Sequence, residues 1–386
     1  MKTRLSRIDF GLLAATLVMV GFSIVLVYSS SCALAQSKYG GADFFLVKQA
    51  IRAALALGCF MVFINVDYHV WGKLGTAAYV GVIALLVYVM VAPSARAIHG
   101  AKRWISLGFV QFQVSELALL VLVVLLAAQL SQDGDGVKDG KKLLGYLVKI
   151  GIVCGLIGLE PNFSTASLVA GLGIVILFVA GARISHLAAL AGAAVPCAVV
   201  AAFGAAYRRH RILAFLHTSD HKSDIGYQAY QALIGLGNGG TFGVGLGQGG
   251  QKYFYLPEPH TDFVFSILGE EMGFVGVVLV LLLFAFIVYC GIKIALNAPD
   301  KLGRLMAFGF TFVLAAYVLI HAAVNVALIP TTGIPLPFLS YGGMSLLFTV
   351  SSMGILLNIS SQADLSPLPH SRRTYRPQPQ RVIGGA

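Results

Sequence analysis

The chain is poor in charged residues. Only 11% of its 386 residues are Asp, Glu, Lys or Arg, whereas 58% are hydrophobic. Its mean hydropathy of +0.83 lies far above that of an ordinary soluble domain. The scarcity of charge excludes a soluble globular protein and predicts a polytopic membrane protein.

Long apolar runs take up most of the sequence. Ten of them are long enough to cross about 30 Å of hydrocarbon as helices. They fall near residues 9–31, 49–66, 75–92, 114–131, 143–159, 165–181, 184–206, 264–290, 305–329 and 338–358. We therefore predict an all-α fold of about ten transmembrane helices. The first run is expected to be retained, because it is about twice as long as a signal-peptide core.

The predicted organisation is one transmembrane domain, residues 1–360, followed by a short tail, residues 361–386. An even number of crossings places both ends on one side, and a modest excess of Lys and Arg on that side indicates the cytoplasm. The tail is rich in Pro and Arg, which predicts disorder. One long loop, residues 207–263, is predicted to be extracytoplasmic, and loops of this length are usually functional.

Cysteine is scarce as well, and there is no soluble basic domain. The five cysteines are dispersed and lie mostly within predicted helices, which indicates neither a disulfide framework nor a metal site. The net charge of +11 has no soluble domain that could present it to nucleic acid, so membrane lipid is the predicted partner. The residues themselves predict no metal site and no cofactor.

The long loop contains a glycine-rich stretch, GNGGTFGVGLGQGGQK, that nearly matches two nucleotide-binding motifs. Gly245, Gly247 and Gly250 fit G-x-G-x-x-G, but no predicted strand precedes them. The phosphate-loop pattern fails because Gln251 stands where lysine is required. Two interpretations remain open: a flexible packing loop, or a loop whose backbone N–H groups face a ligand.

Acidic residues number only sixteen, so those near membrane-spanning runs stand out. A charge at the bilayer centre costs on the order of 3 kcal/mol or more, so such groups tend to face a cavity, pair with a cation or take part in chemistry. Six lie at or inside predicted helix ends near the outer face: Glu116, Glu160, Glu258, Asp262, Glu270 and Glu271. Together with Lys102, Arg103 and Lys252 they predict an outward-facing pocket for a ligand with an anionic group and a hydroxyl to be deprotonated.

The stretch YLPEPHTDFVF places Asp262 at the start of the eighth predicted helix. Thr261 is a good N-cap residue, so Asp262 is predicted to lie in the first turn. Pro257 and Pro259 fix the approach to that turn. If the helix continues without a break, Glu271 lies about 180° around it from Asp262 and belongs to a different site.

On the ninth predicted helix, His321 and Asn325 are four residues apart and share one face. Polar side chains inside a membrane commonly bond to a neighbouring helix, and we predict an interhelical hydrogen bond here. A relay of intramembrane Glu and His side chains in a transporter is the alternative.

Four stretches of the sequence are similar to the signatures of the SEDS family, which includes FtsW, RodA and SpoVE. In order, they are AKRWISLGFVQFQVSEL, EPNFSTA, GNGGTFGVGLGQGGQKYFYLPEPHTDFVFSILGEEMG and NVALIPTTGIPLPFLSYGGMSLL. The likeness extends over nearly the whole transmembrane region. The form GVGLGQGGQK followed by LPEPHTDF resembles the FtsW and SpoVE branch more than RodA.

This resemblance implies a ten-helix peptidoglycan glycosyltransferase in the cytoplasmic (inner) membrane, with both ends in the cytoplasm. It implies polymerisation of lipid II at the outer face for septal synthesis in cell division, together with a class B penicillin-binding protein and other division proteins. Two alternatives from other classes stay open: a lipid II flippase, and a non-enzymatic divisome scaffold.

The resemblance also implies roles for residues. The aspartate of the H-T-D-F motif is Asp262, the implied catalytic residue, for which we predict the role of general base. The residues predicted to contact substrate are Lys102, Arg103, Trp104, Glu116, Lys252, Glu258 and His260. The cations would offset charge on the leaving diphosphate, with or without the help of a divalent cation.

The chain departs from the family pattern at several positions. Val114 stands for the proline of Q-P-S-E, and Leu119 for a lysine often found three residues after the glutamate. Asn162 and Ser164 alter the E-P-D-x-G-T-A motif, and Met344 alters G-G-S-S. The missing lysine matters most, because its loss removes a cation from the predicted pocket.

Overall fold

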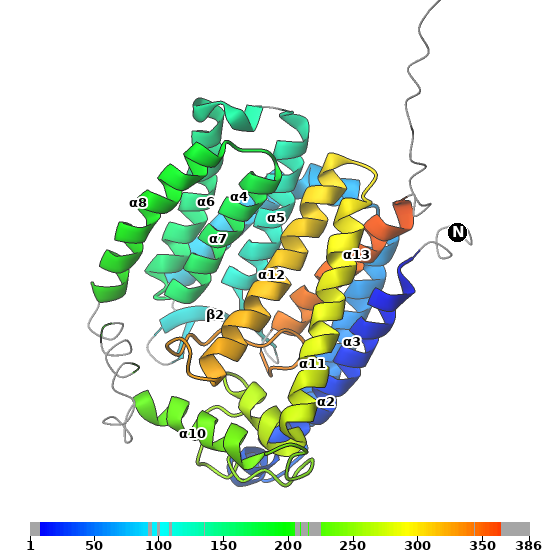
Figure 1. The fold of residues 1–386 in the computed structure, drawn as a ribbon, viewed down its shortest axis with the longest axis vertical. Helices are drawn as coiled ribbons and strands as arrows, with labels where there is room; N and C mark the ends of the chain where they lie inside the picture. The colour runs from blue at the N-terminus through cyan, green and yellow to red at the C-terminus, as the bar shows by residue number, and fades with distance from the viewer. Residues whose placement is uncertain are drawn as a thin grey trace, which may run out of the picture.

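The structure is a computed structural model, shown as a ribbon in Figure 1. It describes residues 8–91, 95–98, 101–107, 110–134, 136–204, 225–342 and 344–363, together with positions 209 and 215. The predicted disordered tail lies outside these described residues, except for its first three positions.

Ten described helices coincide with the ten predicted runs, and the all-α polytopic prediction is confirmed. They are α2 (Phe10–Tyr39), α3 (Phe44–Asn65), α4 (Tyr68–Val91), α5 (Val114–Gln132), α6 (Gly140–Leu159), α7 (Phe163–Val179), α8 (Ile184–Phe203), α11 (Val264–Leu296), α12 (Lys301–Asn325) and α13 (Ser345–Gln362). Seven of the described helices are long and apolar enough to cross a membrane, and α7 and part of α8 are shorter apolar helices.

The first and last described helices, α2 and α13, meet at one end of the bundle. The backbone N–H of Asp9, just before α2, donates to the hydroxyl of Ser360 near the end of α13, over 3.2 Å. Asp9 also caps α2 by accepting from the N–H of Leu12. The start of α2 and the end of α13 therefore lie on the same side of the bundle, as an even number of crossings requires.

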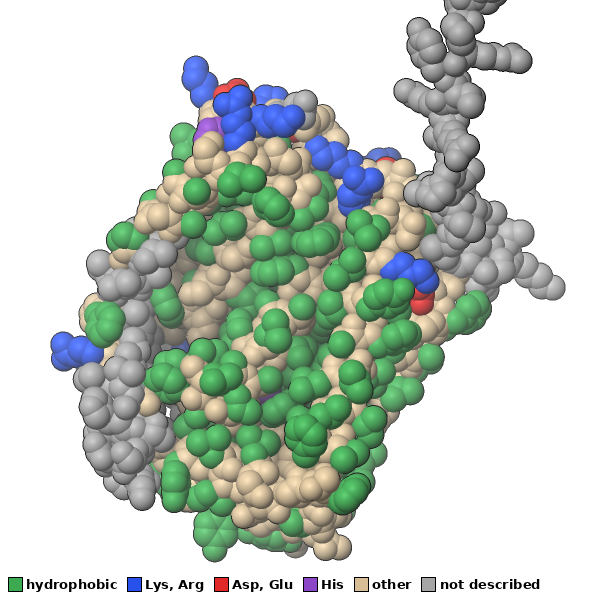
Figure 2. Space-filling view, in the orientation of Figure 1, with side chains coloured by type: hydrophobic (Ala, Val, Ile, Leu, Met, Phe, Trp, Pro, Cys, Tyr) green, Lys and Arg blue, Asp and Glu red, His purple; other side chains and the backbone are tan. Residues whose placement is uncertain are grey.

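The bundle is built around α5. In this helix 72% of the most apolar window is buried, against 28% in α3, α4 and α6, because it packs against α4, α12 and α7. Hydrophobic side chains cover the flank of the bundle, and Lys and Arg side chains gather at one end (Figure 2). This distribution fits helices whose outer faces meet lipid.

A small antiparallel sheet interrupts the helices between α4 and α5. Its strands β1 (Ala95–Ile98), β2 (Ala101–Leu107) and β3 (Val110–Gln113) pair in the order β1-β2-β3. This sheet was not predicted from the sequence, in which residues 93–113 fall between two membrane-spanning runs and read as a loop. The segment is too polar to cross a membrane, and pairing satisfies its backbone N–H and C=O groups.

The predicted long loop contains further structure. Helix α10 (Ile225–Asn238) packs against α11 and α12, and a short 3-10 turn, η1 (Gly136–Lys138), links α5 to α6. In Figure 1, α10 lies at the end of the bundle away from the N-terminus. Most of residues 205–224 lie outside the described part of the chain.

Candidate active site

Asp262 lies just outside α11, not inside it. The helix begins at Val264 with Phe263 as its N-cap, so the prediction that Thr261 caps the helix and Asp262 occupies its first turn is wrong. The N–H groups of Thr261 and Asp262 both donate to the carbonyl of Glu258, each over 3.3 Å. This turn forms because Glu258 adopts a positive φ of 50°, and the sequence gives no signal for it.

The loop between α12 and α13 lies beside the Asp262 carboxylate. Gly333 has a φ of +70°, and a Cβ added there would lie 3.7 Å from Asp262 Oδ2. The same loop contributes Pro337 to the wall of a pocket described below. Residues 326–342 therefore connect the predicted catalytic carboxylate with that pocket.

His260 is buried in packing. Its ring lies 4.8 Å from the Phe45 ring and 5.3 Å from the Tyr341 ring, and only 4% of the residue is exposed. Burial lowers the pKa of His260 to about 4, although the nearby Glu258 acts in the opposite direction. The ring is therefore neutral at pH 7, and in this structure it supports the segment before α11. Glu258 is exposed, with its Oε2 3.4 Å from the Thr261 hydroxyl.

Lys252 is not exposed to a ligand in this structure. Its ammonium donates to Glu271 over 2.8 Å, and both side chains are fully buried. Glu271 also accepts from the hydroxyl of Ser29 in α2, and that hydroxyl accepts from the N–H of Gly247 over 3.1 Å. The predicted diphosphate contact is thus the cation of a buried ion pair that joins α2, the glycine-rich loop and α11.

The glycine-rich loop is a packing element. The carboxylate of Glu270 accepts from the N–H groups of Gly250 and Gln251 over 2.9 and 3.1 Å. A Cβ at Gly239 or Gly243 would overlap the backbone carbonyls of α11. Of the two open interpretations, close packing therefore accounts for these glycines, and the contacts fix the loop against α11 at Glu270 and Glu271.

Helix α11 is broken, whereas the prediction that Glu271 belongs to a different site assumed a helix without a break. Gly273 has a non-helical φ of 66°, and the N–H groups of Phe274 and Val275 donate to Gly240 and Thr241 of the loop. The break follows Glu271, so it does not turn this carboxylate towards Asp262. As predicted for an unbroken stretch, Glu271 has partners of its own.

Arg103 of β2 binds the turn that connects α6 to α7. Its Nε donates to the carbonyl of Glu160 over 3.1 Å, and its Nη2 donates to the carbonyl of Pro161 over 2.9 Å. Trp104 is partly buried in the same strand, where it pairs with Gln113. The side chain of Lys102 lies outside the described part of the structure.

The Glu160 carboxyl group in this turn is buried without a hydrogen-bond partner in the described part of the chain. Only 2% of it is exposed, and neither carboxylate oxygen has a hydrogen-bond partner among the described residues. Burial raises the pKa of Glu160 to about 8, and the charge of Arg103 opposes this only in part. Because the folded state holds this proton more tightly than the unfolded chain does, the carboxyl group lowers stability as pH rises from 4.5 towards 8.

We therefore expect Glu160→Gln to raise the melting temperature of the purified protein at about pH 8.5 and to change it little at about pH 5. The amide has the shape of the protonated acid and no proton to lose. Thermal unfolding of both proteins across this pH range checks the prediction. An equal change at both pH values would contradict it.

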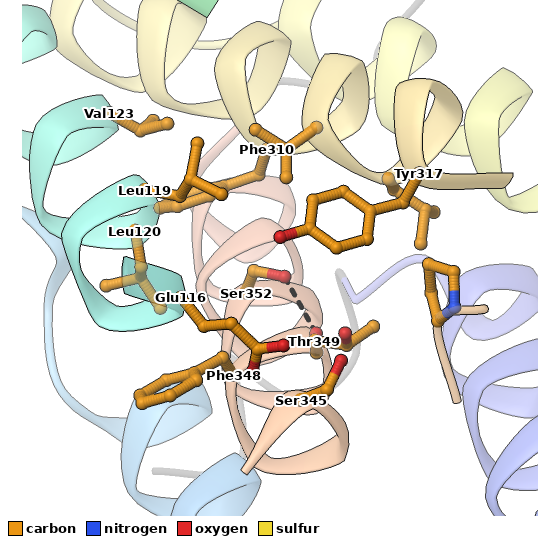
Figure 3. Close-up of a pocket in the computed structure, with 13 residues that line it drawn as sticks. Glu116, Leu119, Leu120, Val123, Phe310, Tyr317, Ser345, Phe348, Thr349 and Ser352 are labelled. Atoms are coloured by element: carbon orange, nitrogen blue, oxygen red, sulfur yellow. Dashed lines mark hydrogen bonds between the residues drawn. The ribbon is translucent and has the colours of Figure 1, made fainter. Parts of the chain in front are cut away.

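Glu116 lies at one end of an apolar pocket between α5, α12 and α13 (Figure 3). The space measures about 490 Å³, part of it open to the surface. Glu116 is 8% exposed, its Oε2 has no hydrogen-bond partner among the described residues, and Ser345 lines the pocket beside it. The remaining lining is mainly apolar: Leu119, Leu120, Val123, Phe310, Val313, Leu314, Tyr317, Pro337, Phe348, Thr349 and Ser352.

The departures from the family pattern shape this region. Leu119 is 2% exposed and forms part of the pocket wall, where a lysine would place a cation. Asn162 caps α7 by accepting from the N–H of Thr165 and donates its amide N–H to the Ser115 hydroxyl, each over 3.4 Å. An aspartate has no N–H for that second bond. Val114 is fully buried, and Met344 is the N-cap of α13.

The structure thus places the loop 326–342 against both Asp262 and the Glu116 pocket, and it buries Lys252 and His260 in packing. Gly333, Pro337, Ser340 and Ser345 were not among the predicted site residues. Their signal was the glycine- and proline-rich stretch TTGIPLPFLSYGG after a membrane-spanning run. No group of three or more His, Cys, Asp or Glu side chains suited to a metal ion occurs among the described residues.

Comparisons with known proteins agree on one family. The family model described as "Cell cycle protein", FTSW_RODA_SPOVE, matches residues 10–365. The "Probable peptidoglycan glycosyltransferase FtsW" of Geobacter sp. (strain M18) is 38% identical over 360 residues, which cover 93% of this chain and 98% of that protein. "Stage V sporulation protein E" of Bacillus subtilis (strain 168) is 38% identical over 363 residues, covering 93% and 99%.

Solved structures share the fold. A chain of the structure described as "Structural coordination of polymerization and crosslinking by a peptidoglycan synthase complex" matches with a TM-score of 0.78 and 28% identity, covering 93% of this chain and 99% of that one. The Thermus thermophilus Rod shape determining protein RodA matches with a TM-score of 0.68 and 28% identity, covering 93% and 98%. The chain therefore belongs to the FtsW, RodA and SpoVE family of cell cycle proteins.

Proposed function

We propose that this protein is a peptidoglycan glycosyltransferase that polymerises lipid II at the outer face of the cytoplasmic membrane, with Asp262 as general base. The observation that carries the proposal is the partly exposed Asp262 carboxylate, which lies next to Gly333 in a loop that also lines the Glu116 pocket. A carboxylate base and an apolar pocket that are joined by one loop suit a substrate with a sugar and a lipid.

In this mechanism the Asp262 carboxylate takes the proton of the acceptor sugar hydroxyl. The hydroxyl oxygen attacks the anomeric carbon of the donor, a glycosidic bond forms, and the bond to the lipid diphosphate breaks with inversion. The guanidinium of Arg103 would offset charge on the departing diphosphate, and Trp104 and Lys102 come from the same strand. The energy for the reaction comes from the donor diphosphate itself.

The remaining predicted contacts receive narrower roles. Glu116 is proposed to meet the substrate at the end of the apolar pocket, whose other walls suit hydrocarbon. Lys252 and His260 are proposed to hold the segment before α11, since both are buried. Glu258 would support the turn that carries Asp262.

Finer assignments of membrane topology, cellular role and partners are proposed as well. We infer cytoplasmic ends, septal synthesis in cell division and a class B penicillin-binding protein as partner, together with other division proteins and membrane lipid. The related chain in a peptidoglycan synthase complex and the FtsW-named relatives support these inferences.

The test is polymerisation of labelled lipid II by the full chain in liposomes, with and without its cognate class B penicillin-binding protein. Lipid II is supplied on the outer face, so a flippase would make no polymer. Glycan strands longer than the disaccharide support the proposal. If none forms under any condition, including with the partner, the chain is a flippase or a scaffold.

Gly333→Ala is expected to lower polymerisation by on the order of 100-fold, because alanine is strained at a φ of +70° and the loop that lies against Asp262 must shift to relieve that strain. The positive φ should also cost about 1–2 kcal/mol of stability. The matched control is Gly181→Ala, at a φ of +100° with no atom within 4 Å of the added Cβ. It should lose similar stability and keep its activity. Equal activity in the two variants would contradict the prediction.

A further inference from the structure

The segment that carries Asp262 is held through three of its own consecutive backbone carbonyls. Each accepts a hydrogen bond from α12 or from the loop that follows it. The pairs are Tyr341 N to His260 O over 2.8 Å, Ser340 Oγ to Thr261 O over 2.7 Å, and Asn325 Nδ2 to Asp262 O over 3.2 Å. We call these three donors and their acceptors the carbonyl clamp.

Asn325 has a second function in the same place. It is fully buried, and its Oδ1 accepts from the N–H of Ser266 over 3.1 Å and from the Ser266 hydroxyl over 2.8 Å. The N-cap residue of α11, Phe263, supplies no side-chain acceptor, so Asn325 caps this helix from α12. The predicted interhelical hydrogen bond is confirmed, and the amide also donates to the carbonyl of His321 over 2.9 Å.

We propose that Asn325 and Ser340 are positioning residues that fix where the Asp262 carboxylate meets the acceptor hydroxyl. The inference rests on the proposed role of Asp262 as general base. One planar amide ties the peptide of Asp262 to the start of α11, and one hydroxyl ties the preceding peptide to the loop that contains Gly333. Proton transfer depends on placement within about 0.5 Å, which rigid supporting contacts provide.

The amide of Asn325 donates to the clamp through its nitrogen and caps α11 through its oxygen, so one substitution can remove the first contact and keep the second. Asn325→Asp keeps an oxygen that accepts from Ser266 and, as a carboxylate, has no donor for the carbonyls of Asp262 and His321. It therefore loosens Asp262 while retaining the cap. Ser340→Ala removes only the donor to Thr261 O and the acceptor for the N–H of Leu336.

A matched control lies near the other end of α12. Asn358 is a buried amide whose Oδ1 accepts from the N–H of Tyr68 at the start of α4 and whose Nδ2 donates to the carbonyl of Ile64. The Tyr68 hydroxyl donates to Asp300, which lies just before the start of α12. Asn325 is the last residue of α12. About 36 Å of helix therefore separates the two sites. Asn358→Asp makes the same chemical change away from Asp262.

The experiment measures kcat and KM for lipid II with full-length protein in liposomes, and the melting temperature of each variant. We expect kcat to fall by about 100-fold in Asn325→Asp and about 10-fold in Ser340→Ala, with KM changed by less than about threefold. Asn358→Asp should lose comparable melting temperature and keep kcat within about threefold. Unchanged kcat in both clamp variants, or an equal fall in Asn358→Asp, would overturn the proposal.

Hydrogen exchange separates this inference from the proposed function. If wild-type protein makes no polymer, the function fails, but exchange of the peptide covering residues 258–268 still tests the clamp. Faster exchange there in Asn325→Asp and Ser340→Ala than in Asn358→Asp supports the clamp. Exchange that does not differ among the three variants overturns it, whatever reaction the protein catalyses.

Discussion

Asp262→Asn is expected to reduce lipid II polymerisation by about 10²- to 10⁴-fold, the usual contribution of a positioned general base. The amide keeps the size of the carboxylate but cannot accept the proton. The backbone carbonyl that binds Asn325 is unchanged, so the variant should fold and insert normally. Polymer formation in liposomes, measured beside the melting temperature, checks the result.

The control for this variant is Asp43→Asn. Asp43 is exposed, precedes α3 and makes no side-chain cap hydrogen bond, so the same substitution there should leave polymerisation intact. Wild-type rates in Asp262→Asn would remove Asp262 from the mechanism. A well-folded Asp262→Asn protein that restores division in cells would instead favour a scaffold.

The position of Asp262 also affects how strong a base its carboxylate can be. A carboxylate in the first turn of a helix is stabilised in its charged form by the helix dipole, which would make it a weak base. Asp262 instead precedes the N-cap, and the first-turn N–H of Ser266 is already bound by Asn325. Because the dipole effect is concentrated in the end turn, this placement weakens the reason to expect poor basicity.

Lys252→Met is expected to destabilise the protein by about 3–5 kcal/mol, because it leaves the buried Glu271 carboxylate without its counter-charge. Glu271→Gln should destabilise similarly by leaving the ammonium unpaired. The double variant contains no buried charge at this place and should recover most of the loss. Thermal unfolding of the wild type, both single variants and the double variant forms a complete cycle.

The same cycle distinguishes the two roles considered for Lys252. The ammonium is fully buried against Glu271, so the double variant should fold and bind lipid II with an unchanged KM. A stable double variant whose KM rises about tenfold or more would restore Lys252 as a diphosphate contact. Additive destabilisation by the two substitutions would show that the ion pair does not couple them.

The sequence determined the parts of this protein that depend on local composition. Apolar runs long enough to cross a membrane specified the ten helices, because an unpaired backbone in lipid is costly wherever the run lies. The stretch NVALIPTTGIPLPFLSYGGMSLL and the H-T-D-F motif indicated the family, and the H-T-D-F motif pointed to Asp262. The interhelical role of Asn325 followed from its place inside such a run.

Only the tertiary structure decided which polar groups meet. Lys252 looked available for substrate, but it is buried in an ion pair with Glu271, 19 residues further along the chain, and sequence spacing contains no information on such pairing. Asp262 lies in a turn closed onto the Glu258 carbonyl and precedes the helix start, and the loop after α12 supplied Gly333, Pro337 and Ser340. Lipid-crossing helices are fixed by their own hydrophobicity, whereas a site between them is fixed by contacts among segments that are distant in the chain.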